Sequence, residues 1–214
     1  MLVACWSVKG GSGTTVVAAA LGLLLASADP RGARLVDLGG DLPAALGVPD
    51  PPGPGVGEWL AAGNEVGGDA LARLEVEVSP GLGLVARGAA PVDSAGGERL
   101  AAALGGNRHA VVDCGPPESA AGLAVAGAAG LSLLVLRPCY LALRRALAVA
   151  IRPSGVILVR EEGRSLGRRD VEDVLGVPVR AEIAWDPVIA RHVDAGLMAG
   201  HLPRALAKAL RRAA

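Results

Sequence analysis

Short apolar runs alternate along the chain with longer segments of helical pattern. The apolar runs are continuous and lack the alternation of polar and apolar positions that marks a half-exposed strand. Continuous runs are typical of strands that are buried on both faces of a sheet. The sequence predicts such strands at Leu2–Val8, Arg34–Leu38, Leu82–Ala86, Ala110–Asp113, Leu131–Leu136, Gly155–Val159 and Val179–Ala184.

The segments between these strands have the pattern of helices. Helices are predicted at Thr14–Ala28, Gly97–Leu104, Tyr140–Ile151, Arg168–Leu175, Pro187–Ala195 and Leu202–Arg212, and a Pro- and Gly-rich loop at Pro49–Gly57. Strands that alternate with helices form βαβ units and a parallel sheet. We therefore predict an α/β fold, a doubly wound and mostly parallel sheet with helices on both faces, in a single domain over residues 1–214.

The composition limits which residues can build the core and which partners the chain can bind. Hydrophobic residues make up 51% of the chain and aromatic residues 2%, so the core must be built from Leu, Val and Ala. The formal net charge is +0, so no global basic field holds nucleic acid. DNA could contact only a local patch, such as Arg137 with Arg144 and Arg145, or Arg168 with Arg169, and we expect these side chains to be solvated instead.

The cysteines and the apolar segments indicate the compartment. Cys5, Cys114 and Cys139 are odd in number and widely spaced, so we expect free thiols in a reducing cytosol. No charged start or cleavage site accompanies the run Met1–Val8, and the run Val16–Ala26 is too short to span a bilayer. A cytoplasmic protein is expected, with recruitment to a pole, the septum or the inner membrane face left open.

The first predicted strand leads into a candidate phosphate-binding loop. Its sequence is Lys9-Gly10-Gly11-Ser12-Gly13-Thr14-Thr15, and a helix follows directly. Glycines let the backbone turn tightly with its N–H groups inward, and the helix N-terminus adds partial positive charge. The candidate nucleotide-binding residues are Lys9, Gly10, Gly11, Ser12, Gly13, Thr14, Thr15 and Val16. The alternative is a Gly-rich turn that binds nothing.

This loop resembles the deviant Walker A loop, KGGxGK[ST], of the ParA/MinD family of P-loop ATPases. The resemblance implies ATP or ADP with Mg²⁺ as cofactors, and Thr15 as a Mg²⁺ ligand. It also implies a homodimer, in which Lys9 reaches the partner's nucleotide and takes part in catalysis. The sequence departs from the pattern at Thr14, which replaces the lysine that contacts the β- and γ-phosphates.

Two acidic strand ends extend the resemblance. Arg34–Asp41 resembles the family's second strand, which implies that Asp37 lies near the attacking water; the alternative is an acid that caps a helix. His109–Pro117 resembles the Walker B strand, which implies that Asp113 holds Mg²⁺ through a water. A late stretch, Val174–Gly196, resembles the family's sequence after these motifs.

The departures from the family pattern set the expected activity. Without the loop lysine, transition-state charge is less well stabilised, so ATP hydrolysis should be weak or absent. The family often has an Asn near the position of Val159 that recognises adenine, and this chain has no Asn there. The chain is most similar to the TadZ/CpaE-like, septum-site-determining branch, which implies pilus, secretion or division-site partners. The alternatives are an active ATPase in DNA partitioning or membrane cycling, and a non-binding pseudo-ATPase that serves as an interaction module.

The last predicted helix carries a leucine stripe with basic neighbours. Leu202, Leu206 and Leu210 share one face, and Lys208 lies off it. MinD-like proteins end in a basic amphipathic helix that binds anionic lipid, so the resemblance implies a peripheral membrane contact. The alternative, which we favour, is a terminal helix whose stripe packs on the sheet.

Overall fold

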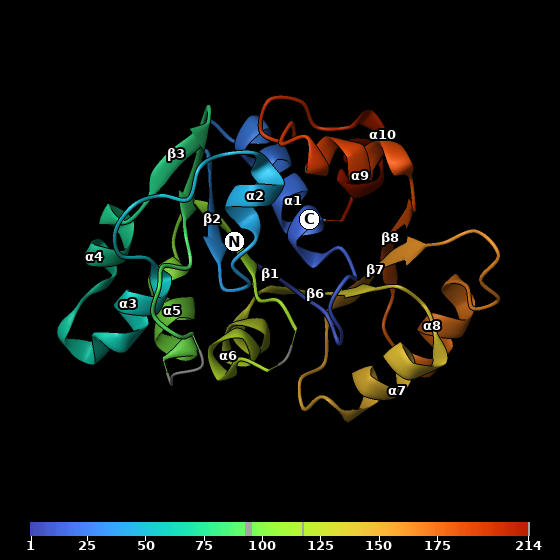
Figure 1. Cartoon of the computed structure of the whole chain (residues 1–214). Coiled ribbons are helices and arrows are strands. Elements are labelled where there is room, and N and C mark those ends of the chain that lie inside the picture. The colour runs from blue at the N-terminus through green and yellow to red at the C-terminus, as the bar shows by residue number, and fades with distance from the viewer. Residues whose placement is uncertain (93–95, 117, 214) are drawn as a thin grey trace.

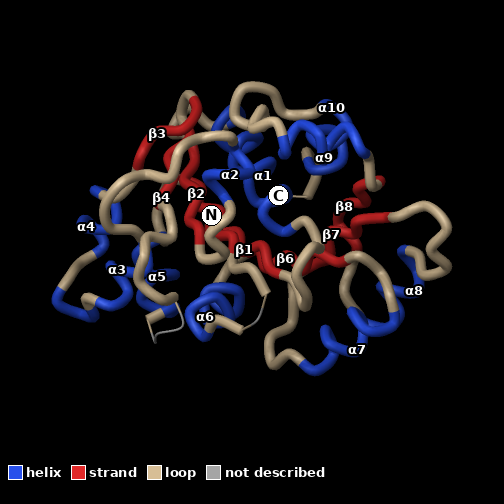
Figure 2. The backbone as a smooth tube through the Cα atoms, viewed as in Figure 1, coloured by secondary structure: helices blue, strands red, loops and turns tan. Residues whose placement is uncertain are grey.

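The computed structural model describes residues 1–92, 96–116 and 118–213 and contains one eight-stranded sheet (Figures 1 and 2). The strand order is β3-β4-β2-β5-β1-β6-β7-β8. The strands are β1 (Leu2–Trp6), β2 (Ala33–Asp37), β3 (Val76–Ser79), β4 (Leu82–Val85), β5 (His109–Asp113), β6 (Leu131–Leu136), β7 (Gly155–Arg160) and β8 (Val179–Ala184). All neighbours pair in parallel except β3 with β4.

Helices cover both faces of this sheet (Figure 1). One face carries α1 (Thr14–Ala28), α2 (Leu42–Leu46), α9 (Pro187–Asp194) and α10 (Arg204–Leu210). The other carries α3 (Val56–Ala61), α4 (Gly68–Arg73), α5 (Gly97–Leu104), α6 (Ala120–Ala128), α7 (Tyr140–Ala148) and α8 (Arg168–Leu175). A short 3₁₀ helix, η1 (Gly63–Glu65), lies between α3 and α4. The predicted doubly wound α/β fold is confirmed.

The strands divide their side chains between two cores. In β1, Val3 and Cys5 pack into the core beneath α1, whereas Ala4 and Trp6 pack into the opposite core. The indole N–H of Trp6 donates to the hydroxyl of Ser132, 3.0 Å away, so this buried polar pair is satisfied. Burial on both faces explains why strands inside the sheet, such as β1 and β6, are mainly apolar.

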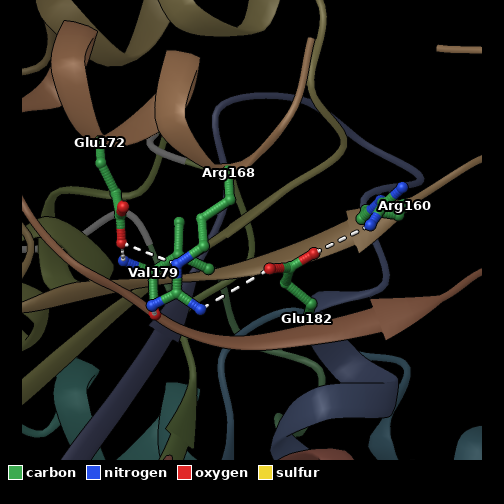
Figure 3. Close-up of polar contacts among 5 residues, drawn as sticks. All are labelled: Arg160, Arg168, Glu172, Val179 and Glu182. Atoms are coloured by element: carbon green, nitrogen blue, oxygen red, sulfur yellow. Dashed lines mark hydrogen bonds and ion pairs between the residues drawn. The ribbon is translucent and has the colours of Figure 1, made fainter. Parts of the chain in front are cut away.

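Side chains of α8 contact the sheet edge at β8 (Figure 3). Glu172 accepts the backbone N–H of Val179 at 2.8 Å, and Arg168 donates to the Val179 carbonyl at 2.6 Å. Glu182 forms ion pairs with Arg160 and Arg168. These contacts occupy backbone groups of an edge strand that would otherwise be open to pairing with another chain. Arg168 is therefore not simply a solvated side chain, as the sequence suggested.

The C-terminal helix α10 packs its leucine stripe inward. Leu206 and Leu210 are both 1% exposed and lie in the core shared with α1 and β8. Their burial supports the alternative of a packed terminal helix and leaves this stripe unavailable to lipid. Among the described residues, no helix has both the length and the apolar character needed to cross a bilayer.

Several predicted elements need correction. The sequence did not indicate β3, α2, α3, α4, η1 or α6. The predicted loop Pro49–Gly57 is wrong at its end, because α3 begins at Val56. There the Glu58 carboxylate accepts the N–H groups of Gly55 and Ala90, which fixes the start of the helix.

Predicted boundaries also shift by one to three residues. The predicted strand Leu2–Val8 ends at Trp6, the predicted helix Tyr140–Ile151 ends at Ala148, and Leu202–Arg212 is helical only over Arg204–Leu210. Pro203 occupies the position before that last helix, where its fixed φ favours a helix start.

Candidate functional site

The candidate phosphate loop connects β1 to α1 and is open to solvent. Gly11 has φ of +73° and Gly13 of +91°, backbone conformations that favour glycine. Apart from the adjoining residues of the chain, no atom of the described residues lies within 4 Å of the place where a Cβ on Gly10, Gly11 or Gly13 would stand. The hydroxyls of Ser7 and Ser12 each donate to the Lys9 carbonyl at 3.0 Å. These contacts hold the loop as an open turn at the N-terminus of a long helix.

The loop opens into a pocket of about 530 Å³. Residues 10–16 form one wall, and the side chains of Asp41 and Asp194 belong to the others. Among the described residues that line this pocket there is no lysine or arginine. Thr14 is 7% exposed. Within this lining, positive potential comes from the backbone amides and the helix N-terminus.

Asp37 ends β2 with both carboxylate oxygens occupied. Oδ1 accepts the N–H of Gly40 at 2.6 Å, and Oδ2 accepts the N–H of Leu42 at 2.9 Å. Leu42 is the first residue of α2, so Asp37 supports the start of that helix. Burial raises the pKa of Asp37 to about 6, against the opposing effect of these two hydrogen bonds. The side chain is thus both a structural support and a proton-accepting group near neutrality.

Asp113 ends β5 as the register partner of Asp37. Its Oδ1 accepts the N–H of Gly115 at 3.1 Å, whereas its buried Oδ2 has no partner among the described residues. Burial raises the pKa of Asp113, and the Thr15 side chain partly opposes this shift. A buried, unpartnered carboxylate oxygen beside Thr15 has the chemistry of a cation-binding position. Pro117, at the end of the predicted motif, lies outside the described residues.

Lys9 is turned away from the phosphate pocket. Its Nζ lies 3.9 Å from the Sγ of Cys139, the residue that precedes α7. The backbone N–H of Ala142 at the start of α7, and then the charge of Lys9, lower the pKa of Cys139. Within one chain, Lys9 therefore does not supply charge to its own phosphate loop.

An apolar cleft of about 260 Å³ adjoins the loop. It runs from Gly11–Gly13 past Val159 to the segment Ala184–Val193. Trp185 is 52% exposed at its wall. The sequence pointed to Val159 here, but it placed Arg137 in a solvated patch and gave Trp185 and Asp194 no role at the site, because only the sheet topology brings them to the loop. The size and apolar walls suit a planar ring next to a phosphate loop.

The residues fit a magnesium nucleotide in part. The open backbone cradle, Thr15 and the unpartnered Asp113 oxygen fit phosphates with Mg²⁺. The lining of the phosphate pocket does not supply a cationic side chain, and Asp41 and Asp194 add negative charge. None of the three histidines is among the described residues that line the phosphate pocket or the cleft, and no cluster of metal-ligating side chains occurs among the described residues.

Comparison with known proteins identifies the fold. MinD from Pyrococcus horikoshii, determined with Mg-ADP, superposes with a TM-score of 0.80 at 23% identity, covering 99% of this chain and 94% of that one. A ParA family ATPase from Chlorobium tepidum gives 0.75 at 19% identity, covering 98% and 96%. An ATP complex of McdA from Cyanothece gives 0.72 at 18% identity, covering 99% and 95%.

These likenesses establish the fold alone. No family model matches the chain, and no curated protein matches it in sequence. The chain has the ParA/MinD-like P-loop ATPase fold, as the loop and strand-end motifs predicted.

Proposed function

We propose that the chain is a positioning or partitioning protein of the ParA/MinD type with a degenerate ATP site. The observation that carries this proposal is the open phosphate loop beside an unpartnered Asp113 oxygen, in a pocket without a cationic side chain. Such a site binds phosphates through backbone amides and lacks the charge for fast hydrolysis. It would act through nucleotide-dependent assembly more than through turnover.

The chain's residues divide the work at this site. The backbone of residues 10–15 holds the phosphates, and Thr15 with Asp113 holds Mg²⁺, which neutralises phosphate charge when bound. Each Asp37 oxygen keeps a free lone pair, so the carboxylate can orient a water while it supports residues 40–42. In the dimer, the Lys9 side chain leaves Cys139 and reaches the nucleotide bound by the second copy. Each copy thus gives the other the cation that its own phosphate pocket lacks.

The cellular role follows from the resemblance of KGGSGTT and VDLGGDLPAALG to proteins of the TadZ/CpaE-like and septum-site-determining branch. We propose a cytoplasmic homodimer that marks a pole or septum for a pilus, secretion or division apparatus. A fluorescent fusion should form foci at one such place, and the Lys9→Ala fusion should be diffuse. A wild-type fusion that is diffuse, or that lies along the nucleoid, contradicts this role.

A pseudo-ATPase that binds no nucleotide is the second candidate, favoured by the acidic and cation-free lining of the pocket. Light scattering with Mg-ATP separates the two. The proposed function predicts a dimer that Lys9→Ala abolishes, whereas Lys208→Ala, the matched control at the other lysine of the chain, leaves it intact. A mass that does not change with nucleotide supports the pseudo-ATPase. Turnover clearly above that of the Lys9→Ala, Asp37→Ala double variant indicates an active ATPase instead.

A further inference from the structure

Arg137 bridges the phosphate loop and the end of β7. It follows β6 directly, and its Nη1 donates to the Gly11 carbonyl at 3.0 Å. Its Nη2 forms an ion pair with Glu161, which follows β7. The side chain also lines the cleft together with Gly11–Gly13. The guanidinium group is therefore held between Gly11 and Glu161, at the lining of the cleft.

The contact between Arg137 and Glu161 can be exchanged without leaving a carboxylate unpaired. Arg164 binds Glu161 as well, with its Nη2 2.7 Å and its Nε 2.8 Å from Oε2. If Arg137 turns away, Glu161 keeps this second cation. Removing one partner from a shielded ion pair is costly when the remaining charge is left unpaired. Here the remaining charge, Glu161, is not left unpaired.

Charge near the loop favours such an exchange. The lining of the phosphate pocket includes Asp41 and Asp194 but no cationic side chain, and Lys9 is directed to Cys139. Arg137 touches the loop directly, through the Gly11 carbonyl. Guanidinium groups bind phosphate oxygens through two parallel N–H donors, a geometry that Thr14 cannot offer.

We propose that Arg137 is the anion-binding side chain of this cleft and exchanges Glu161 for a phosphate oxygen of a nucleoside di- or triphosphate. The apolar part of that ligand fills the cleft, and Arg137 supplies positive charge that the loop lacks. The proposal rests on the proposed function, in that the loop must accept a nucleotide. Arg137 should therefore raise nucleotide affinity and Glu161 should lower it, because Glu161 competes with the ligand for Arg137.

Calorimetric titration of Mg-ADP and Mg-ATP into wild type and three variants tests this exchange. Arg137→Gln should weaken binding about tenfold, the effect of losing a charge-assisted hydrogen bond. Glu161→Gln should tighten binding about threefold, because Arg137 is then free to meet the ligand more of the time. Arg160→Gln is the matched control, because Arg160 pairs with Glu182 outside the cleft lining (Figure 3), and its affinity should not change.

The opposite signs separate a binding role from a structural one. If Arg137→Gln and Glu161→Gln weaken binding equally, the pair only supports the fold and the proposal is overturned. Unchanged affinity in Arg137→Gln overturns it too. If wild type binds neither nucleotide, the proposed function fails in its binding step. In that case the same variants are built on Thr14→Lys, and the changes in affinity of Arg137→Gln and Glu161→Gln decide the role of Arg137 as above. If Thr14→Lys binds no nucleotide either, both the proposed function and the role of Arg137 are overturned.

Discussion

Asp37 and Asp113 are register partners at the ends of β2 and β5, and their carboxylates are used differently. Both Asp37 oxygens accept backbone N–H groups, whereas Asp113 Oδ2 has no partner among residues 1–92, 96–116 and 118–213. Adjacent strand ends thus carry one acid that supports a loop and one buried acid that has an oxygen without a partner. The carboxyl edge of a parallel sheet is where such ligands bind.

Asp113→Asn should remove the effect of Mg²⁺ on nucleotide affinity while the protein stays folded. The buried Oδ2 is unpartnered, so losing its charge costs little stability. Calorimetry with and without Mg²⁺ measures the effect, and Asp37→Asn, at the neighbouring position, is the control that should keep the Mg²⁺ dependence. A Mg²⁺ effect that survives in Asp113→Asn and disappears in Asp37→Asn would reverse the two roles.

Asp37 should make stability fall as pH rises through the range between its two pKa values. Its pKa is raised from 3.8 to about 6 in the folded state, so the folded chain binds the proton more tightly than the unfolded chain does. That stabilisation is present below the unfolded value and lost as pH passes about 6.

Asp37→Asn should therefore gain stability relative to wild type between pH 4 and 7, by up to roughly 3 kcal/mol, on top of a constant loss of one N–H contact. Urea unfolding at several pH values measures this difference. A difference that stays constant with pH contradicts the raised pKa of Asp37.

Gly13→Ala should lower the free energy of unfolding by about 1 kcal/mol, because Gly13 has φ of +91°. Space around the added Cβ is free, so the cost is one of backbone conformation and not of collision. Gly10→Ala is the matched control: it has the same open space, and its φ is not positive. Chemical denaturation compares the two, and equal losses would contradict the observed loop conformation.

Leu206→Ala should destabilise the fold by about 2–4 kcal/mol, since the side chain is 1% exposed. Lys208→Gln should leave the free energy of unfolding nearly unchanged. Vesicles of anionic lipid should not bind wild type through α10, and cosedimentation of wild type and Lys208→Gln measures this. Lipid binding that Lys208→Gln abolishes would mean that α10 leaves the sheet at a membrane.

The sequence predicted the elements whose burial pattern is uniform. The bounds of α1, α5, α8, β6 and β8 match the predictions, because each has a continuous apolar run, a clear helical period or, in β8, an alternation of buried and exposed positions. The missed helix α6 consists largely of Ala and Gly, so it has no contrast between faces. The missed strand β3 is short and half exposed, and its pairing with β4 is what defines it.

Local motifs located the loop and the two acids, but not their surroundings. The position of Lys9 beside Cys139 and that of Arg137 across the cleft depend on β6 lying next to β1. That adjacency follows from strand order, which no local pattern encodes. For the same reason the sequence left open whether Asp37 caps a helix, and the contact with Leu42 shows that it does.

Calorimetric titration of ATP and ADP, with and without Mg²⁺, into wild type and Thr14→Lys tests the central claim most directly. A degenerate but working site predicts micromolar binding by wild type, about −8 kcal/mol, and tighter binding by Thr14→Lys. Binding by Thr14→Lys alone would show that the backbone cradle is intact and that the wild-type site no longer binds nucleotide. That result would contradict the nucleotide-dependent assembly proposed for this protein.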